Sequence, residues 1–337
     1  MKISVLSDGA WGTVLALLLC GNGHKVKLWG PFPDYVREMA KKRENTRFLP
    51  GTHLGAELQL EENISEAVKG AELIVLAAPS QYLRETLIKL KDSFNANTQI
   101  IVNVAKGIEN GSFKRMSELC FEILGQGISY VALSGPSHAE EVVRKCPTAV
   151  VVASSNLEKA KLVQSVFMND YFRIYTSDDI GGVELGGALK NVLAIAAGVI
   201  DGMKLGDNPK AALITRGIAE MARLGIALGG RYETFSGLSG IGDLIVTCVS
   251  GFSRNRHVGE ELGRGKKIDD IISAMGMVVA EGVKTTAGAY ELARSNNVDT
   301  PIINEVYSVL YKGKDPRTAL SDLMTRKARH EHDGICD

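Results

Sequence analysis

Short apolar runs alternate with amphipathic stretches through the first half of the chain. Runs rich in β-branched and aliphatic residues predict strands at residues 3–6, 26–29, 73–77, 100–104, 130–133, 149–153 and 172–175. Helical periodicity between these runs predicts helices at residues 13–20, 33–42, 81–91, 117–124 and 157–168. Because continuously apolar strands that alternate with helices are typical of parallel sheets, we predict a doubly wound, mostly parallel sheet.

The pattern changes near residue 180. From Glu184 onward the β-branched runs disappear and long helical patterns follow. One of them is predicted to begin at Asn208-Pro209, an N-cap followed by proline at the first helical position, and to continue to about Leu228. We therefore expect an α/β domain at residues 1–180, an all-α domain at residues 181–326 and a polar tail at residues 327–337.

Composition narrows the class of protein. The chain has 337 residues, enough for two cores, and 39 basic residues balance 39 acidic ones. Because the chain has no net charge, it provides no extended positive potential that would attract nucleic acid or acidic lipid. Any anion must therefore be bound by local groups. The five cysteines show no C-x-x-C pair, which favours a reduced, cytoplasmic protein. No apolar run is expected to span a membrane, and residues 14–20 are predicted to form a helix rather than a signal peptide.

The loop after the first predicted strand, SDGAWG at residues 7–12, is similar to the dinucleotide fingerprint G-x-G-x-x-G. Ser7 stands at the first glycine position, and Asp8 adds a negative charge near the expected diphosphate. Gly9 would let the backbone approach the pyrophosphate, and Gly12 would let the helix pack on the strand. The second predicted strand ends in LWGPF at residues 28–32, a turn with neither the acid typical of NAD sites nor the arginine typical of NADP sites. The choice between NAD and NADP stays open.

Lys190 is the only charged residue between Leu185 and Ile200. An ammonium is costly to bury in an apolar helix, which points to a chemical role. The alternative is a lysine that snorkels to the surface. On a helix, its face would also carry small residues that form a flat strip for a ligand: Gly186, Gly187, Ala194 and Ala197.

Two loops beyond predicted strands add candidates. Lys106 follows the strand at residues 100–104, and ligands of doubly wound sheets bind at the carboxyl ends of strands, although a solvated turn lysine is an alternative. The loop at residues 134–141 opens a helix, and its N–H groups are candidates for holding substrate or the nicotinamide ribose. His138 in that loop is either an acid–base residue or a solvated cap.

A phosphate site is predicted in the helical half. Ser253 is expected to be an N-cap with Arg254 and Asn255 in the first turn, which combines free N–H groups, the helix dipole and a guanidinium. The alternative is a surface arginine cluster paired with Glu260 and Glu261. The sequence shows no spacing typical of metal ligands and no G-x-S-x-G motif.

In their order along the chain, these motifs resemble those of NAD(P)-dependent glycerol-3-phosphate dehydrogenase of the soluble bacterial type. The motifs are WG at residues 11–12, SGPSHA at 134–139, E-x-x-GALKNV at 184–192, GIGD at 240–243 and SRN at 253–255. The resemblance runs from residue 2 to about residue 326. It implies a Rossmann-type domain, a helical domain and an active site between them. It also implies hydride transfer between dihydroxyacetone phosphate and sn-glycerol 3-phosphate, which supplies glycerophospholipid synthesis.

The resemblance further implies roles for single residues. By this resemblance, Lys190 corresponds to the general acid/base of the family, and Lys106 corresponds to a second lysine that contacts the substrate. Asp243 and Asn191 would orient Lys190. The other implied substrate contacts are Gly135, Ser137, Ser253, Arg254 and Asn255. The implied cofactor contacts are Gly9, Ala10, Trp11, Gly12, Lys106, Ala139, Arg254, Val279 and Glu281.

Two other functions stay open on sequence alone. A β-hydroxyacid dehydrogenase shares the domain plan and uses a helix lysine, but it needs a carboxylate site in place of a phosphate site. A dinucleotide-binding sensor without turnover is suggested by Ser7 and Asp8. The sequence also leaves the oligomeric state open, with a homodimer as one candidate.

Overall fold

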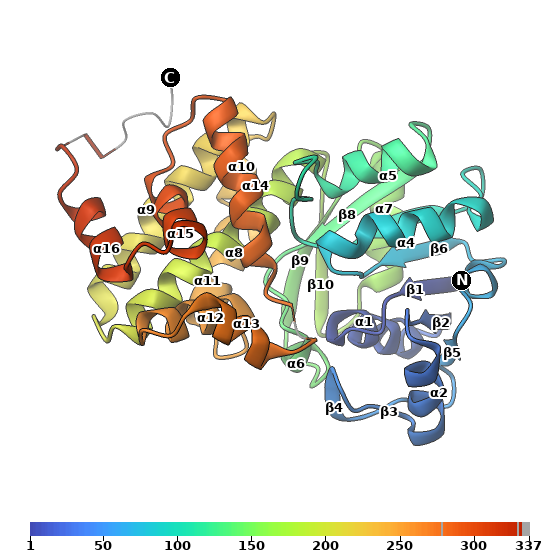
Figure 1. The fold of residues 1–337 in the computed structure, drawn as a ribbon. Helices are drawn as coiled ribbons and strands as arrows, with labels where there is room; N and C mark the ends of the chain where they lie inside the picture. Colours follow the sequence, from blue (N-terminus) through green and yellow to red (C-terminus); the bar gives the residue numbers. More distant parts are fainter. Residues whose placement is uncertain (278, 329, 332–337) are drawn as a thin grey trace. The chain divides into compact units, whose positions relative to one another are not determined.

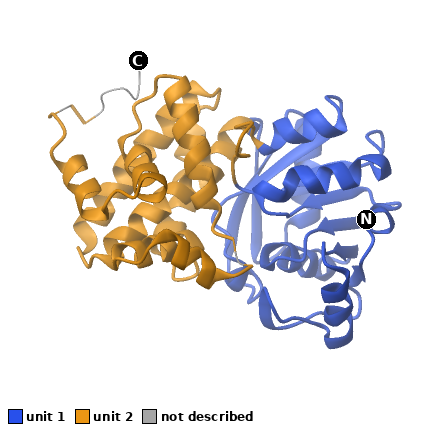
Figure 2. Ribbon diagram, in the orientation of Figure 1, with its two compact units in different colours: residues 1–106, 116–180 blue, residues 107–115, 181–337 orange. Residues whose placement is uncertain are grey.

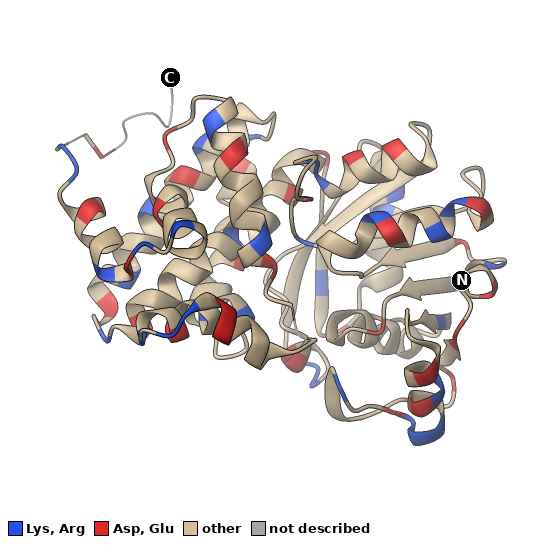
Figure 3. Cartoon of the chain, viewed as in Figure 1, with Lys and Arg blue, Asp and Glu red and all other residues tan. Residues whose placement is uncertain are grey.

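The computed structural model describes residues 1–277, 279–328 and 330–331. Figure 2 shows two compact units, a first unit of residues 1–106 and 116–180 and a second unit of residues 107–115 and 181–337. Most of the expected polar tail at residues 327–337 lies outside the described residues. Basic and acidic residues are interspersed along both units, as the balanced composition implies (Figure 3).

The first unit is built on an eight-stranded sheet with the order β10-β9-β8-β7-β6-β1-β2-β5 (Figure 1). All neighbouring strands are parallel except β8 and β9, so the predicted mostly parallel sheet is confirmed. Every predicted strand is present, but β5 and the hairpin β3–β4 were not predicted. The strands are β1 (Lys2–Leu6), β2 (Lys25–Trp29), β3 (Glu44–Asn45), β4 (Leu49–His53), β5 (Gln59–Glu61), β6 (Leu73–Leu76), β7 (Ile100–Asn103), β8 (Ser129–Ser134), β9 (Thr148–Ala153) and β10 (Phe172–Ser177).

Helices connect these strands, and the strand order reverses at β1. From β1 the chain builds β2 and β5 on one side, and then β6 and later strands on the other. Ligands of doubly wound sheets bind beyond the carboxyl ends of strands at such a reversal, which is where residues 7–12 lie. The helices are α1 (Ala10–Gly21), α2 (Pro33–Lys42), α3 (Ile64–Val68), α4 (Leu83–Leu90), α5 (Met116–Leu124), α6 (Ala139–Val142) and α7 (Leu157–Phe167).

The second unit is helical throughout its described regular structure, as predicted. Residues 107–115 belong to it because Ile108 is fully buried in its core and Arg115 lies 3.4 Å from the Glu184 carboxylate. Its helices are α8 (Ile180–Gly202), α9 (Asp207–Ala227), α10 (Tyr232–Phe235), α11 (Asp243–Val249), α12 (Arg254–Gly263), α13 (Ile268–Met275), α14 (Glu281–Ser295), α15 (Pro301–Lys312) and α16 (Pro316–Met324), with a π-helical turn at Leu238–Gly242.

The start of α9 corrects one prediction. The N-cap is Gly206 and not Asn208, so the helix begins at Asp207 with Pro209 inside its first turn. Gly206 has φ +89°, a conformation open to glycine that lets the chain turn into the helix earlier than expected. Proline is tolerated there because the first N–H groups of a helix have no intrahelical acceptor.

The long helix α8 tests the expectation that no apolar run spans a membrane. Its 23 residues have a windowed mean hydropathy of 1.6, so by length and composition it is apolar enough to cross a membrane. However, 89% of that window is buried inside the protein. Close packing explains the apolar composition: a Cβ added to Gly198 would lie 1.9 Å from the carbonyl oxygen of Arg256 on α12. The properties of α8 are therefore those of a core helix.

A buried carboxylate joins α9 to α15. Glu220 is 1% exposed and accepts hydrogen bonds from the backbone N–H groups of Ile302, at 2.8 Å, and Ile303, at 3.2 Å. Burial raises the pKa of Glu220 to about 7, although these two hydrogen bonds oppose the rise. Glu220 thus satisfies two N–H groups that the first turn of α15 leaves without an intrahelical partner.

We expect Glu220→Ala to lower the free energy of unfolding by about 3 kcal/mol, because it leaves both N–H groups buried and unpaired. Urea denaturation measures this loss. The control Glu291→Ala removes an ion pair with Arg294, whose side chain is 71% exposed, and should cost less than about 0.5 kcal/mol. Equal losses in the two variants would show that Glu220 is not a structural cap.

Candidate active site

The loop between β1 and α1 has the geometry of a dinucleotide fingerprint despite its serine. Ser7 has φ +118°, a region that favours glycine, so serine adopts the conformation of the missing first glycine at a cost on the order of 1 kcal/mol. A Cβ added to Gly12 would lie 2.2 Å from the carbonyl oxygen of Ser7, which confirms the packing role expected for Gly12. At Gly9 a Cβ would meet only the Ser7 hydroxyl, at 3.7 Å, so the backbone there is accessible to a ligand.

The first turn of α1 is chemically suited to an anion. Its N-cap, Gly9, makes no side-chain capping hydrogen bond, and no acidic residue lies in the first turn. Trp11 lies in this turn, and its buried Nε1–H has no hydrogen-bond partner among the described residues. Free N–H groups and the helix dipole stabilise a pyrophosphate, so this loop fits a dinucleotide cofactor.

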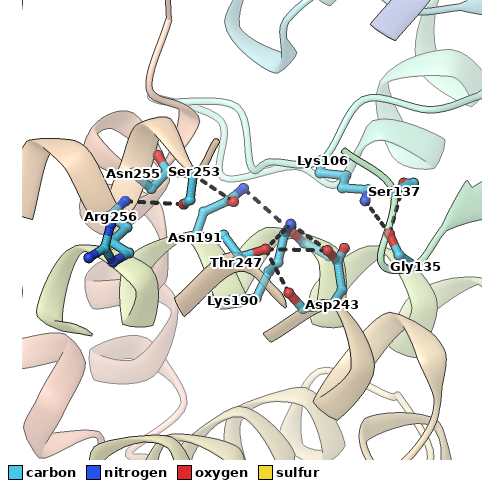
Figure 4. Close-up of polar contacts among 11 residues, drawn as sticks. Lys106, Gly135, Ser137, Lys190, Asn191, Asp243, Thr247, Ser253, Asn255 and Arg256 are labelled. Atoms are coloured by element: carbon cyan, nitrogen blue, oxygen red, sulfur yellow. Dashed lines mark hydrogen bonds and ion pairs between the residues drawn. The ribbon is translucent and has the colours of Figure 1, made fainter. Parts of the chain in front are cut away.

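Three predicted residues of the first unit lie together (Figure 4). Lys106, which follows β7, donates from Nζ to the carbonyl oxygen of Gly135 at 2.8 Å, and Ser137 donates to the same oxygen at 2.9 Å. Lys106 is therefore a half-buried, bonded lysine rather than a solvated one. Gly135 has φ +135°, and a Cβ there would lie 2.9 Å from the Cα of Val150, so only glycine fits. As expected, a helix follows, with α6 beginning at Ala139.

Lys190 is held in a buried polar cluster of the second unit. It is 7% exposed, and its Nζ donates to Asp243 Oδ1 at 2.6 Å and to Thr247 Oγ1 at 2.7 Å (Figure 4). The Thr247 hydroxyl donates in turn to the backbone carbonyl of Asp243 at 2.6 Å. The snorkelling alternative is wrong, because the ammonium is bonded inside the protein. Sequence reasoning missed Thr247, although its spacing of four residues from Asp243 places both on one helix face.

The strip of small residues beside Lys190 has a structural explanation. A Cβ added to Gly186 would lie 2.6 Å from the carbonyl oxygen of Ser239, so the π-helical turn already covers that position. Ala194 and Ala197 are fully buried in the hydrophobic core. The proposed ligand strip is therefore wrong at these positions, where small residues permit close packing.

A pair of asparagines connects three helices near this cluster. Asn255 on α12 donates from Nδ2 to Asn191 Oδ1 on α8 at 2.8 Å, and its Oδ1 accepts from the backbone N–H of Gly282 on α14 at 2.9 Å. Asn191 is adjacent to Lys190, and the two cofactor candidates Val279 and Glu281 lie just before Gly282. The asparagines thus fix the start of α14 beside α8 and α12.

The first turn of α12 is capped as predicted. Ser253 is the N-cap, and its Oγ accepts from the backbone N–H of Arg256 at 3.2 Å. Arg256 binds Asp201 at 2.6 Å and lies 3.7 Å from Glu260, so only the Glu260 pairing of the alternative is present for that arginine. Glu261 pairs instead with Arg264 and Lys266. The side chain of Arg254 forms no hydrogen bond or ion pair with any described residue, and it lines a groove of about 510 Å³ together with Ser253.

Metal and disulfide chemistry is not suggested within the described ranges. They include no group of three or more histidine, cysteine, aspartate or glutamate side chains arranged to hold a metal. Their cysteines, Cys20, Cys120, Cys146 and Cys248, are all free.

The chain is similar to known proteins over nearly its full length. It matches the family profiles of the NAD-dependent glycerol-3-phosphate dehydrogenase N-terminus at residues 2–160 and C-terminus at residues 179–321. Glycerol-3-phosphate dehydrogenase (NAD(P)+) of Chlorobium phaeobacteroides (strain BS1) is 51% identical, covering 98% of this chain and 99% of that protein. The same enzyme of Geobacillus kaustophilus (strain HTA426) is 50% identical, with coverages of 99% and 97%. The crystal structure of glycerol-3-phosphate dehydrogenase from Coxiella burnetii has a TM-score of 0.93 at 38% identity, with coverages of 96% and 99%.

We expect Asp243→Ala to lower the free energy of unfolding by about 3 kcal/mol, because it leaves the Lys190 ammonium buried without its carboxylate. The double variant Lys190→Met, Asp243→Ala removes both charges, so its free energy of unfolding should fall by less than that of Asp243→Ala alone. Urea denaturation of both variants measures the difference. A double variant at least as unstable as Asp243→Ala would contradict the idea that the unpaired charge is the cause.

Proposed function

Because the chain belongs to the NAD-dependent glycerol-3-phosphate dehydrogenase family, we propose that it interconverts dihydroxyacetone phosphate and sn-glycerol 3-phosphate, with Lys190 as the general acid/base. The observation that carries this proposal is the buried Lys190 ammonium, which Asp243 and Thr247 hold at 2.6 and 2.7 Å. Family membership argues against both alternatives, the β-hydroxyacid dehydrogenase and the sensor without turnover.

The proposed reaction is a hydride transfer balanced by one proton. A nicotinamide cofactor, NADH or NADPH, held by the loop at residues 7–12 would supply the hydride for the C2 carbonyl carbon of dihydroxyacetone phosphate. The carbonyl oxygen gains negative charge, and Lys190 stabilises it and donates the proton that yields the alcohol. In the reverse direction Lys190 removes that proton. Asp243 and Thr247 position the ammonium for both directions, and Asn191 supports its helix.

The phosphate of the substrate is assigned to the first turn of α12. The side chain of Arg254 makes no ion pair among the described residues, so its guanidinium is available for a phosphate, and the capped turn adds backbone N–H groups. Both ends of the Asn255 side chain are already bonded, which leaves its backbone N–H as its main contribution. Lys106, Gly135 and Ser137 are the proposed contacts in the first unit.

The cofactor is assigned to the loop at the strand reversal. Gly9 and Gly12 let the chain approach the pyrophosphate, and Ala10 and Trp11 belong to the free first turn of α1. The remaining proposed contacts are Lys106, Ala139, Arg254, Val279 and Glu281. The product, sn-glycerol 3-phosphate, is the backbone of glycerophospholipids, so we assign the enzyme to their synthesis in the cytoplasm.

We expect Lys190→Ala to lower kcat by about a thousandfold, because the proton donor is lost. Turnover is followed by NADH or NADPH absorbance with dihydroxyacetone phosphate, and cofactor binding is measured separately by calorimetry. Cofactor affinity should stay unchanged, and the exposed-lysine control Lys267→Ala should keep its activity. Near-normal turnover in Lys190→Ala would exclude the lysine as the acid.

We expect Arg254→Ala to raise KM for dihydroxyacetone phosphate by about 10- to 100-fold, since a hydrogen bond to a charged group contributes about 1.5–3 kcal/mol. Steady-state kinetics with saturating cofactor measures the change. The control Arg294→Ala removes an exposed arginine of the same unit and should leave KM unchanged. An unchanged KM in Arg254→Ala would exclude this residue from phosphate binding.

A further inference from the structure

Two departures from the usual dinucleotide site meet in the first unit. Asp8 stands inside the fingerprint loop, and Gly30 stands directly after β2, where NAD sites usually carry an acid. A Cβ added to Gly30 would lie 2.4 Å from Asp8 Oδ2 and 2.7 Å from its Cγ. The Asp8 carboxyl group therefore occupies the space that a side chain of residue 30 would need. The fingerprint loop therefore places a carboxyl group at the end of β2, where residue 30 itself has no side chain.

The Asp8 carboxyl is buried but not saturated with hydrogen bonds. The residue is 3% exposed, and Oδ2 accepts no hydrogen bond from any described residue. The backbone of Asp8 is fixed, because its carbonyl accepts from Asn45 Nδ2 at 2.6 Å and from Thr13 Oγ1 at 3.3 Å. Buried polar atoms are nearly always paired, so an unpaired oxygen at a ligand-binding strand end points to a donor on a ligand.

We propose that Asp8 accepts a hydrogen bond from the adenosine ribose 2′-hydroxyl and thereby selects NAD over NADP, an inference that rests on the proposed function. Carboxylates at the end of β2 bind this hydroxyl in NAD sites, whereas NADP sites provide an arginine for the 2′-phosphate. In this chain the carboxylate comes from the fingerprint loop. A 2′-phosphate beside it would face a like charge, which disfavours NADP.

The charges around Asp8 agree with this assignment. Burial raises the pKa of Asp8 to about 6, against the lowering effects of its own backbone N–H and of Arg47, so the carboxylate form predominates at neutral pH. Arg47 is the cation whose charge acts on Asp8. Its guanidinium lies over the Tyr35 ring, 4.0 Å from the centroid, and 4.0 Å from the Glu38 carboxylate. These two neighbours already engage Arg47.

Calorimetric titration of the purified protein with NADH and with NADPH tests the inference without turnover. The wild-type protein should bind NADH at least 10-fold more tightly than NADPH. Asp8→Asn, which keeps the shape and removes the charge, should shrink this ratio at least 10-fold, mainly through tighter NADPH binding. Asp8→Ala, which adds no bulk beside Gly30, should shrink it as well. The control Glu66→Gln, an exposed acid of α3, should leave the ratio unchanged.

The possible failures are distinguishable. A wild-type preference for NADPH, or an unchanged ratio in both Asp8 variants with wild-type melting temperatures, would overturn the inference and leave the proposed function standing. Failure of the wild-type protein to bind either dinucleotide would overturn the proposed function, and the inference with it.

Discussion

Burying one ammonium group sets the main constraint on the second unit. Lys190 lies in a helix whose other residues from 185 to 200 are uncharged, and it is 7% exposed. A buried charge is tolerable only with an opposite charge and further hydrogen bonds, and Asp243 and Thr247 provide both. Supplying them requires α11 to begin beside α8, and the backbone contact at Gly186 lets the preceding turn approach closely. The cluster of Lys190, Asp243 and Thr247 therefore constrains how α8 and α11 pack, in addition to its proposed chemical role.

Where local chemistry determined the structure, the sequence was sufficient to predict it. Apolar runs located β6, β7, β8 and β9, which are almost entirely buried and so have few polar positions to obscure the pattern. The run at β10 was also located, although Arg173 and Tyr175 in it are exposed. The cap at Ser253 was predictable because capping depends on one side chain and the next three residues. The strands β3, β4 and β5 were missed because they are short and partly exposed.

Prediction failed where the cause lies far away in the sequence. The small residues around Lys190 indicated a ligand surface, yet the π-helical turn, about fifty residues later, fills the position at Gly186. Thr247 lies 57 residues from Lys190, so no local pattern joins them. The start of α9 shifted because a glycine with positive φ precedes Asn208, and sequence alone does not reveal φ. Tertiary packing decided the cases of Gly186 and Thr247, whereas the local backbone conformation of Gly206 decided the start of α9.

The fingerprint loop shows how two apparent defects can serve one site. Ser7 keeps the glycine conformation at φ +118°, and Asp8 places its carboxyl where residue 30 has no side chain. Strained backbone and unpaired buried oxygens are costly, so they persist where the surrounding structure or a ligand compensates for them. Gly12 is required by packing alone, because its Cβ would lie 2.2 Å from the Ser7 carbonyl oxygen. The strained backbone of Ser7 and the unpaired Oδ2 of Asp8 therefore favour a working cofactor site over a decayed one.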